Sequence, residues 1–280
     1  MSKPKAIGLY REIKLAGKPG SDQRILDFVA DEMKNKGFDV STMFPSQFIK
    51  ERAGDRDSDL IFSMARDAGI NDYLSLIKDN KPVFIINSPA SIRVSFNRFL
   101  TYAKVMENGV RVPEAKTYLI DELQFSDLEG RVILKPANRH EYWFVIDKEF
   151  HFDAAMETYR CLGLHEVMVQ KFVKGEDVKF YAIGKKVIIS NQIRESFPKE
   201  TIDEIERSVL AVGEATGLKI FGGDFIIDTK DNNKVYCVDI NDWPSFGTMG
   251  ELSQEEAGAE IANLIVEELN NFKAKNNVNN

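Results

Sequence analysis

Short apolar runs alternate with amphipathic stretches along the first third of the chain. Ser21–Lys36 has apolar residues at three- and four-residue spacing and ends near Gly37, as expected of a helix with a glycine cap. Leu74–Lys78 also has a helical pattern. The runs of strand length are Lys5–Tyr10, Phe38–Val40, Leu60–Met64 and Val83–Ile86. Strands that alternate with helices predict a parallel α/β sheet.

The pattern changes after one more helix, predicted at Ser91–Asn108 and closed by Gly109, so we place a boundary near Arg111. Strands and hairpins then predominate. The expected elements are strands at Val132–Leu134, Trp143–Ile146 and Glu166–Val173, hairpins at Val178–Ile183 with Lys186–Ser190 and at Phe225–Ile227 with Val235–Ile240, and helices at Phe152–Leu162, Thr201–Thr216 and Glu255–Phe272. This order predicts an α/β domain at residues 1–110, then α+β lobes at residues 111–180 and 181–280.

Composition excludes several classes of protein. The 280 residues are 43% apolar and 29% charged, an ordinary globular balance. The net charge of -7 argues against a nucleic-acid partner, although a local Lys/Arg cluster can still hold a small anionic substrate. With neither a signal peptide nor a membrane span in the sequence, we expect a cytoplasmic protein with no membrane partner. Cys161 and Cys237 lie far apart in apolar runs, which predicts two buried free thiols.

Two acidic residues near the C-terminus are embedded in apolar strands. Asp239 and Asn241 are two positions apart, so on an extended strand both side chains point to one face. Burying a carboxylate is costly unless it is paired or binds a cation. If Asp224 lies on the neighbouring antiparallel strand, three oxygen ligands converge, a set that suits Mg²⁺ or Mn²⁺. The alternative is a hairpin in which these are ordinary residues at the ends of the loop.

Several polar residues could bind a nucleotide or an anion. Lys135 ends the apolar strand V-I-L-K-P, where its ammonium suits a phosphate contact but could equally be solvated. Residues 167–173 could connect two lobes and read an adenine edge with their backbone. Lys179 lies on one face of a strand and Arg194 follows it. Both could face a cleft and hold anionic substrate groups, or each could line a solvated sheet face.

The order of these motifs resembles the ATP-grasp superfamily over roughly residues 80–270. The motifs are a Lys-Pro strand end, a Val-Gln strand, a D-x-K strand before Gly184, an arginine, a G-x-D strand and a D-I-N strand. Three details are similar to inositol tris/tetrakisphosphate kinases: N-R-H-E after the Lys-Pro strand, D-I-N where most ligases of this fold carry Glu-Val-Asn, and the pairing of Lys179 with Arg194.

The resemblance implies an ATP-grasp fold, in which an N-terminal α/β domain precedes two α+β lobes that clasp ATP. It also implies the roles of particular residues. ATP would contact Arg98, Lys135, Gln170, Lys171 and Val173, and Mg²⁺ or Mn²⁺ would be held by Asp224, Asp239 and Asn241. The acceptor and the transferred phosphoryl group would be contacted by Lys14, His140, Lys179 and Arg194.

Three functions are compatible with the sequence. The first is a kinase that transfers the γ-phosphoryl group of ATP to a hydroxyl of a small, inositol phosphate-like substrate, which His140 and Asp239 favour. The second is a carboxylate–amine ligase that acts through an acyl phosphate. The third is a regulatory nucleotide-binding module, against which the complete set of metal ligands argues. The chain departs from the family at Ser245, where glycine is usual, and in having no glycine between Pro136 and His140.

Overall fold

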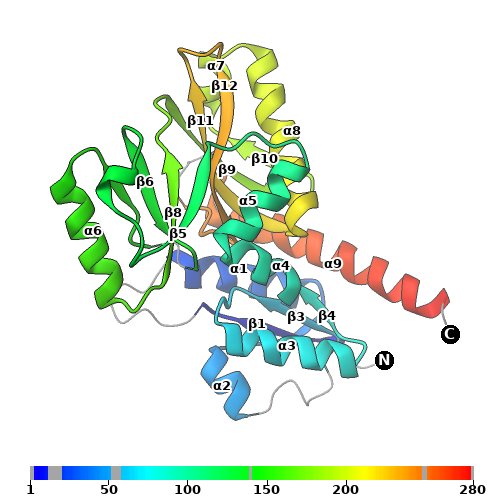
Figure 1. Ribbon diagram of the computed structural model, residues 1–280. Coiled ribbons are helices and arrows are strands. Elements are labelled where there is room, and N and C mark those ends of the chain that lie inside the picture. The colour runs from blue at the N-terminus through cyan, green and yellow to red at the C-terminus, as the bar shows by residue number, and fades with distance from the viewer. Residues whose placement is uncertain (1–2, 12–20, 52–57, 139–140, 248–250, 279–280) are drawn as a thin grey trace.

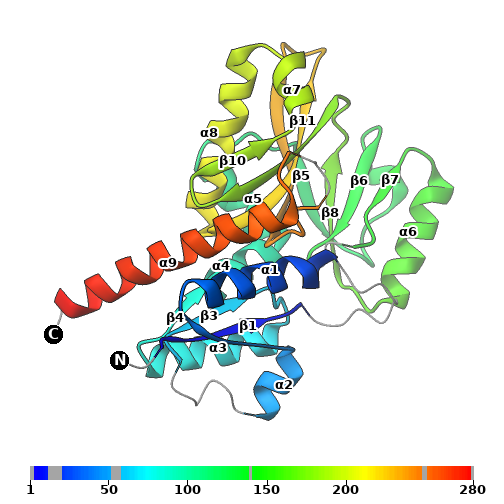
Figure 2. The ribbon, with the colours of Figure 1, turned by 180° about the vertical axis from the view of Figure 1, so that it is seen from behind.

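The computed structural model describes residues 3–11, 21–51, 58–138, 141–247 and 251–278, which form three four-stranded sheets with their helices (Figures 1 and 2). In the first sheet and around it lie β1 (Lys5–Leu9), α1 (Ser21–Asn35), β2 (Asp39–Met43), α2 (Pro45–Lys50), β3 (Leu60–Ser63), α3 (Ala68–Asn80), β4 (Phe84–Ile86), α4 (Pro89–Phe96) and α5 (Arg98–Glu107). The second sheet has β5 (Ala115–Leu119), a short 3-10 helix (Phe125–Asp127), β6 (Val132–Pro136), β7 (Phe144–Ile146), α6 (Glu149–Cys161) and β8 (Glu166–Lys171). The third has β9 (Glu176–Ile183), β10 (Lys186–Ile189), α7 (Asn191–Ser196), α8 (Lys199–Thr216), β11 (Ile220–Asp228), β12 (Lys234–Asp242) and α9 (Gln254–Val278).

The first sheet, with its helices, is called the N-terminal unit. Its strands run parallel in the order β2-β1-β3-β4, which confirms the predicted α/β pattern. Ile7 and Leu9 of β1 pack towards α2 and α3, whereas Ala6 packs towards α1 and α9. Both faces are therefore covered, and this explains why β1, β3 and β4 read as continuous apolar runs, whereas the edge strand β2 has exposed polar positions. The last helix, α9, lies against the first, so closely that a Cβ on Gly258 would stand 2.6 Å from the Cβ of Phe28.

The second sheet forms the central lobe and is antiparallel, in the order β5-β8-β6-β7. The helix α6 covers one face through Phe152 and Tyr159, which pack with Leu134. Because side chains alternate along a strand, the neighbouring residue Lys135 points to the opposite face. That face turns towards β12, because Lys135 donates a hydrogen bond to the carbonyl oxygen of Val238.

The third sheet forms the C-terminal lobe, in the order β10-β9-β11-β12. One face is apolar and is covered by α8, with Phe180 and Phe225 in its core. The other face carries Lys179, Asp224 and Asp239 in register across β9, β11 and β12. Sheet membership changes between β8, which ends at Lys171, and β9, which begins at Glu176, so β9 lies wholly in the third sheet although the sequence placed the lobe boundary at residue 180.

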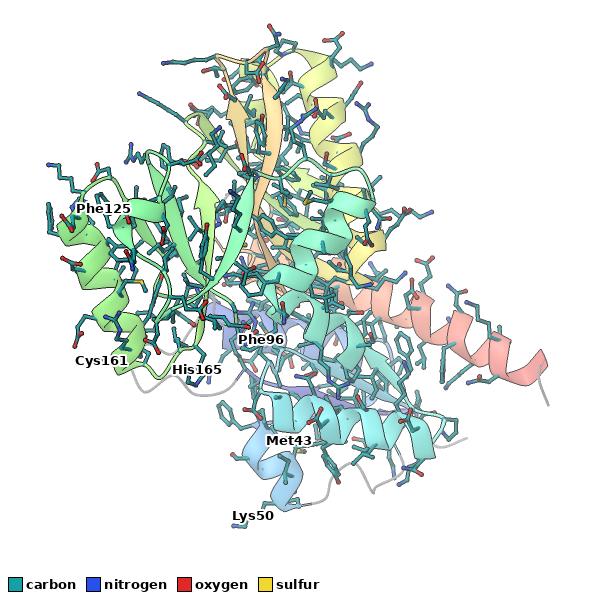
Figure 3. The ribbon with its side chains drawn as sticks, viewed as in Figure 1. Met43, Lys50, Phe96, Phe125, Cys161 and His165 are labelled. Carbon is teal, nitrogen blue, oxygen red and sulfur yellow. The ribbon has the colours of Figure 1, made fainter. Side chains whose placement is uncertain are left out.

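The structure corrects two sequence predictions. The helix expected at Ser91–Asn108 is two helices, α4 and α5, which meet at Asn97. Asn97 has extended backbone angles, and its side chain accepts a hydrogen bond from the backbone N of Leu100 at 2.9 Å, so it caps α5. Cys161 is exposed, not buried, and it is the last residue of α6 (Figure 3). The strand β5 and the helices α2 and α7 had no clear sequence signal.

No helix in the described ranges combines the length and apolarity that a membrane crossing requires.

Gly223 allows β11 and β12 to approach closely beside Asp239. A Cβ at this position would stand 2.1 Å from the carbonyl oxygen of Asp239 and 2.9 Å from the ring of Phe180. We therefore expect Gly223→Ala to lower the free energy of unfolding by about 1–3 kcal/mol through overpacking, measured by thermal unfolding. In Gly247→Ala the new Cβ would be 3.4 Å from its nearest neighbour, so this control should change stability by less than about 0.5 kcal/mol. Equal melting temperatures for the two variants would contradict the expectation.

Candidate active site

A charged cluster lies between the central and C-terminal sheets, beside the start of α5. We use this name for Arg98, Lys135, Lys179, Asp224, Asp239 and Asn241. Asp224 and Asp239 are directly paired across β11 and β12, and Lys179 is paired with Asp224 on the other side. Asn241 follows Asp239 by two residues, so its side chain lies on the same face. The structure therefore brings together the three residues that the sequence predicted as metal ligands.

Ion pairs and hydrogen bonds join the members of the cluster. Arg98 Nη1 lies 2.6 Å from Asp239 Oδ1, and Asn241 Nδ2 donates to Asp239 Oδ2 at 2.7 Å. Lys179 Nζ lies 2.8 Å from Asp224 Oδ1. Arg98 is buried at the start of α5, and its backbone N donates to the carbonyl oxygen of Ala137 in the central lobe. Each carboxylate thus has a cation beside it.

Lys135 is the most perturbed amine of the cluster. It is buried, and its Nζ donates to the carbonyl oxygen of Val238 at 2.6 Å. Burial lowers the pKa of Lys135 to about 8, although the nearby Asp239 carboxylate opposes the shift. The amine of Lys135 therefore loses its proton near physiological pH. This behaviour is typical of a buried cation for which the protein does not supply a complete counter-ion.

The other ion pair of the cluster is asymmetric. Burial raises the pKa of Asp224, while its bond to Lys179 opposes this effect. Lys179 is less buried, so for this amine the attraction of Asp224 outweighs the loss of hydration, and its pKa is raised. In this pair the proton therefore stays on Lys179, but Lys179 alone does not fully stabilise the negative charge of Asp224. A cation at Asp224 would lower its pKa.

Gln170 has no hydrogen-bond partner in the described part of the chain, although its side chain is fully buried. Both its Oε1 and its Nε2 are unsatisfied. It is paired with Ile133 on β6, two residues before Lys135, so it shares the face of the central sheet that turns towards β12. Leaving one such buried group unsatisfied costs about 1–3 kcal/mol, which favours a ligand as the missing partner.

An open cavity with about 820 Å³ of space between its walls lies at the connection between the central and C-terminal lobes. We call it the hinge cavity. It is lined by Pro113, Glu114, Lys171, Phe172, Val173, Lys174, Asp228, Lys230, Asp231 and Tyr236. Tyr236 precedes Asp239 by three residues on β12, a separation of about 10 Å along a strand. The hinge cavity and the charged cluster therefore lie along one strand, with Lys135 bonded to Val238 between them.

The residues present fit a hard divalent cation. Within the described ranges there is no group of three or more His, Cys, Asp or Glu that could hold a metal, so a site here consists of two carboxylates and an amide. Carboxylate and amide oxygens suit Mg²⁺, which keeps several positions for water and phosphate oxygens and needs few protein ligands. The cations of the cluster, Arg98, Lys135 and Lys179, suit the phosphates.

Other predicted site residues lie elsewhere. Arg194 is bonded to Glu206 of α8 at 2.8 Å, and no contact among the described residues joins it to Lys179 or Asp224. Lys171 and Val173 both line the hinge cavity, although the side chain of Lys171, which follows Gln170, points to the face of the central sheet opposite Gln170. Lys14 and His140 lie outside the described residues.

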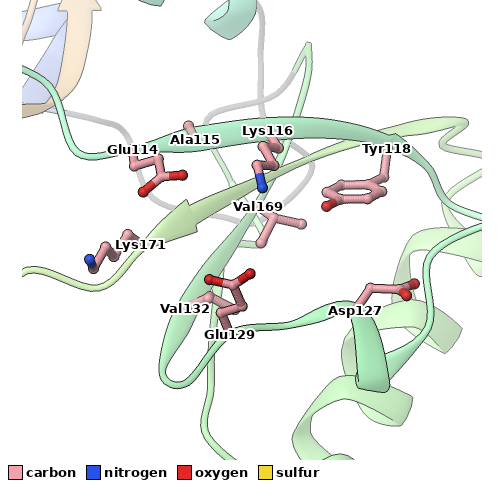
Figure 4. Close-up of a pocket in the computed structure, with 9 residues that line it drawn as sticks. All are labelled: Glu114, Ala115, Lys116, Tyr118, Asp127, Glu129, Val132, Val169 and Lys171. Atoms are coloured by element: carbon pink, nitrogen blue, oxygen red, sulfur yellow. The ribbon is translucent and has the colours of Figure 1, made fainter.

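A second pocket lies on the outer face of the central sheet. Its empty space is about 540 Å³, and Lys116, Tyr118 and Glu129 project over Val169 (Figure 4). Val169 is the neighbour of Gln170 on β8, so strand alternation separates this pocket from the face that carries Gln170 and Lys135. The side chain of Lys171 belongs to this outer face (Figure 4).

Comparisons with known proteins agree with this geometry. A family model described as the inositol 1,3,4-trisphosphate 5/6-kinase ATP-grasp domain matches residues 183–256. This segment includes Asp224, Asp239 and Asn241. A search of curated proteins found no match.

Solved structures match over almost the whole chain. A D-alanine–D-alanine ligase from Bacillus anthracis is 14% identical with a TM-score of 0.72, covering 98% of this chain and 99% of that chain. The same ligase complexed with ATP is 15% identical with a TM-score of 0.72 and covers 97% and 99%. A RimK domain ATP-grasp protein from Sphaerobacter thermophilus DSM 20745 is 14% identical with a TM-score of 0.71 and covers 94% and 99%. The chain has the ATP-grasp fold, as predicted.

Proposed function

We propose that the chain is a Mg²⁺- and ATP-dependent enzyme, and more specifically a kinase that phosphorylates a hydroxyl of a small anionic substrate. The observation that carries the proposal is the charged cluster: three oxygen donors and three cations on one side of a cleft, with the hinge cavity at its far end. The matching family model is named for a kinase, and the matching structures include a ligase that has also been solved in complex with ATP, which supports an enzyme that uses ATP.

The chemistry of each residue at this site indicates the role that it would have. The hinge cavity would take the nucleobase, and the unsatisfied amide of Gln170, on the face of the central sheet that turns towards β12, would bind another part of the nucleotide. Lys135 and Arg98 would contact the phosphates, and Asp224, Asp239 and Asn241 would hold Mg²⁺. Bound there, Mg²⁺ would supply charge neutralisation for the transferring phosphoryl group. Lys179, on the exposed side of Asp224, would stabilise the same charge from the acceptor side.

The acceptor residues follow from the resemblance and from position. Lys14 and His140 remain proposed contacts of the acceptor and the phosphoryl group. Arg194 would have to leave Glu206 to reach them, because its guanidinium is bonded to that residue. Lys179 is therefore the described residue best placed to contact an anionic acceptor.

The second candidate is a carboxylate–amine ligase. It is favoured by the D-alanine–D-alanine ligase structures, which are ligases by title and match more than nine-tenths of the chain. The kinase is favoured by the family model that matches the metal-binding strands, and by Asp239 in place of glutamate. Both reactions use the same nucleotide and metal residues, so only the acceptor distinguishes them.

The distinguishing experiment measures ADP release from ATP and Mg²⁺ with inositol phosphates, polyols and amino-acid pairs, and identifies products by mass. A kinase yields an acceptor heavier by one phosphoryl group. A ligase yields an amide, and with hydroxylamine in place of the amine it yields a hydroxamate. We expect the phosphorylated alcohol and no hydroxamate. A hydroxamate formed together with ADP would overturn the kinase proposal. A failure to bind ATP at all would overturn the proposal that the chain is an ATP-dependent enzyme.

A further inference from the structure

The turn that follows the metal strand is buried and has an unfavourable backbone. β12 ends at Asp242, one residue after Asn241, and both Asp242 and Trp243 are buried. Trp243 has a φ of 33°, a positive value that few residues other than glycine adopt. Such a conformation costs free energy and persists only where the surroundings enforce it. The turn is therefore held from outside.

Two arginines of the N-terminal unit hold this turn. Arg66, just after β3, forms an ion pair with the Asp242 carboxylate through Nε, and its Nη2 donates to the carbonyl oxygen of Asp242 at 3.0 Å. Arg11, just after β1, donates from Nη2 to the carbonyl oxygen of Trp243 at 2.8 Å. β1 and β3 are neighbours, so their carboxyl ends present both guanidiniums to one turn. The planar fork of a guanidinium fixes direction as well as distance.

The contacts that the two arginines make with this turn also affect Asn241. Successive side chains on a strand point to opposite faces, so Asp242 turns away from the cluster while Asn241 turns towards it. If the strand end rotates and Asp242 leaves Arg66, Asn241 rotates out of the cluster with it. In the structure Asn241 is in place, because its Nδ2 donates to Asp239 Oδ2 at 2.7 Å.

We propose that Arg66, assisted by Arg11, is a positioning residue for the metal site. It holds Asp242 so that Asn241 presents its amide oxygen beside Asp224 and Asp239. The inference rests on the proposed function, since it takes these three residues to bind Mg²⁺. It adds that the N-terminal unit, although it supplies no metal ligand itself, determines the geometry of the metal site.

The test measures binding of Mn²⁺ as a spectroscopic substitute for Mg²⁺, by the electron paramagnetic resonance of free Mn²⁺ in the presence of ADP. Arg66→Met should weaken Mn²⁺ binding by about 10- to 100-fold, the range for residues that support a metal ligand. ADP binding without metal, in EDTA, should change by less than about twofold, because the hinge cavity is untouched. Arg66→Lys should rescue only part of the loss, since an ammonium cannot make both contacts.

Arg93→Met is the matched control. Arg93 belongs to the N-terminal unit and pairs with Asp72, but this pair is half exposed and contacts neither Asp242 nor Trp243. This variant loses the same charge and should bind Mn²⁺ as the wild type does. If Arg66→Met does not fold, Asp242→Asn tests the same pair from the other side and should lower Mn²⁺ affinity in the same way.

The outcomes separate the inference from the proposed function. Wild-type Mn²⁺ affinity in Arg66→Met would overturn the positioning role, as would an equal loss of ADP affinity in EDTA, which indicates general disruption. If Asp239→Asn also binds Mn²⁺ normally, or if the wild type binds none, the assignment of the metal site is wrong. The positioning role and the proposed function then both fail. A selective loss in Arg66→Met and Asp239→Asn, but not in Arg93→Met, supports both.

Discussion

Asp239→Asn should lower turnover by about 10³-fold at saturating ATP, because it removes a charged metal ligand worth several kcal/mol and each 1.36 kcal/mol is a factor of ten. The substitution keeps the shape of the side chain and the strand register beside Asp224. The measurement is the steady-state rate of ADP release with Mg²⁺ and the acceptor that the product assay identifies. Mn²⁺ binding should fall further than in Arg66→Met, since a ligand itself is lost and not only its support.

The same variant changes stability, and this effect has to be separated from the metal effect. Arg98 is buried and its ion pair with Asp239 would be lost, which costs about 1.5–3 kcal/mol for a bond to a charged group. The double variant Arg98→Met with Asp239→Asn removes both charges and should recover most of the stability without recovering Mn²⁺ binding. Asp153→Asn, an exposed change on α6, should alter neither property. Normal turnover in a folded Asp239→Asn protein would exclude Asp239 as a ligand.

Lys135→Met should stabilise the protein and weaken its affinity for ATP at the same time. The pKa of Lys135 is about 8, which is below the ordinary value, so at pH 7 the folded state pays for holding a proton on a buried amine. This cost is about 3 kcal/mol at 1.36 kcal/mol per pKa unit. Part is offset by the bond to Val238, which the variant loses, so we expect a gain of about 1–3 kcal/mol in urea unfolding. ATP affinity should fall by about 10- to 150-fold with the loss of a charge-assisted contact.

The depressed pKa of Lys135 determines how the stability and the ATP binding of the protein change with pH. Below pH 8 the folded and unfolded states both hold the proton and the destabilisation is complete. Between pH 8 and the ordinary pKa only the unfolded state holds it, so the wild type gains stability with rising pH and its deficit relative to Lys135→Met shrinks. Phosphates restore the proton, so ATP binding should take up about half a proton at pH 8 and close to one proton near pH 9, measured by calorimetry in buffers of different ionisation enthalpy.

Lys179→Met is the control for this proton. The pKa of Lys179 is raised by Asp224 after the opposing effect of burial, so this amine is already charged at pH 8–9 and its removal should leave the uptake unchanged. Proton uptake that persists in Lys135→Met would assign it to another group. A variant no more stable than the wild type at pH 7 would mean that the amine of Lys135 is hydrated in solution.

Local patterns explain why much of the fold could be predicted. The strands β1, β3 and β4 of the N-terminal unit are largely buried and read as apolar runs, and α8 has a clear apolar stripe. The break at Asn97 was missed because apolar periodicity continues across it, although asparagine before Arg98 is a possible helix cap. β5 was missed because it is an edge strand with exposed residues such as Lys116, so it lacks a hydrophobic signal.

The site was predictable where its residues are close in sequence and not where the contacts are long-range. The i, i+2 spacing of Asp239 and Asn241 predicted their common face, and the hairpin predicted the approach of Asp224. The pairing of Arg66 with Asp242 joins positions in two different sheets, and no local pattern indicates it. Arg194 looked like a possible cleft residue because it follows the strand of Lys179 in the sequence, but it lies on α7 and pairs with Glu206.

The packing of α9 on α1 has a consequence for synthesis of the protein. A ribosome makes the N-terminal sheet before the helix that completes its covering, because all the chain between Asn35 and Gln254 separates them. At 5–20 residues per second the interval is about 10–50 s. Throughout that time the nascent chain exposes apolar surface that α9 later buries, so it is a target for chaperones and for aggregation. The N-terminal sheet is therefore translated well before it can reach its final packing.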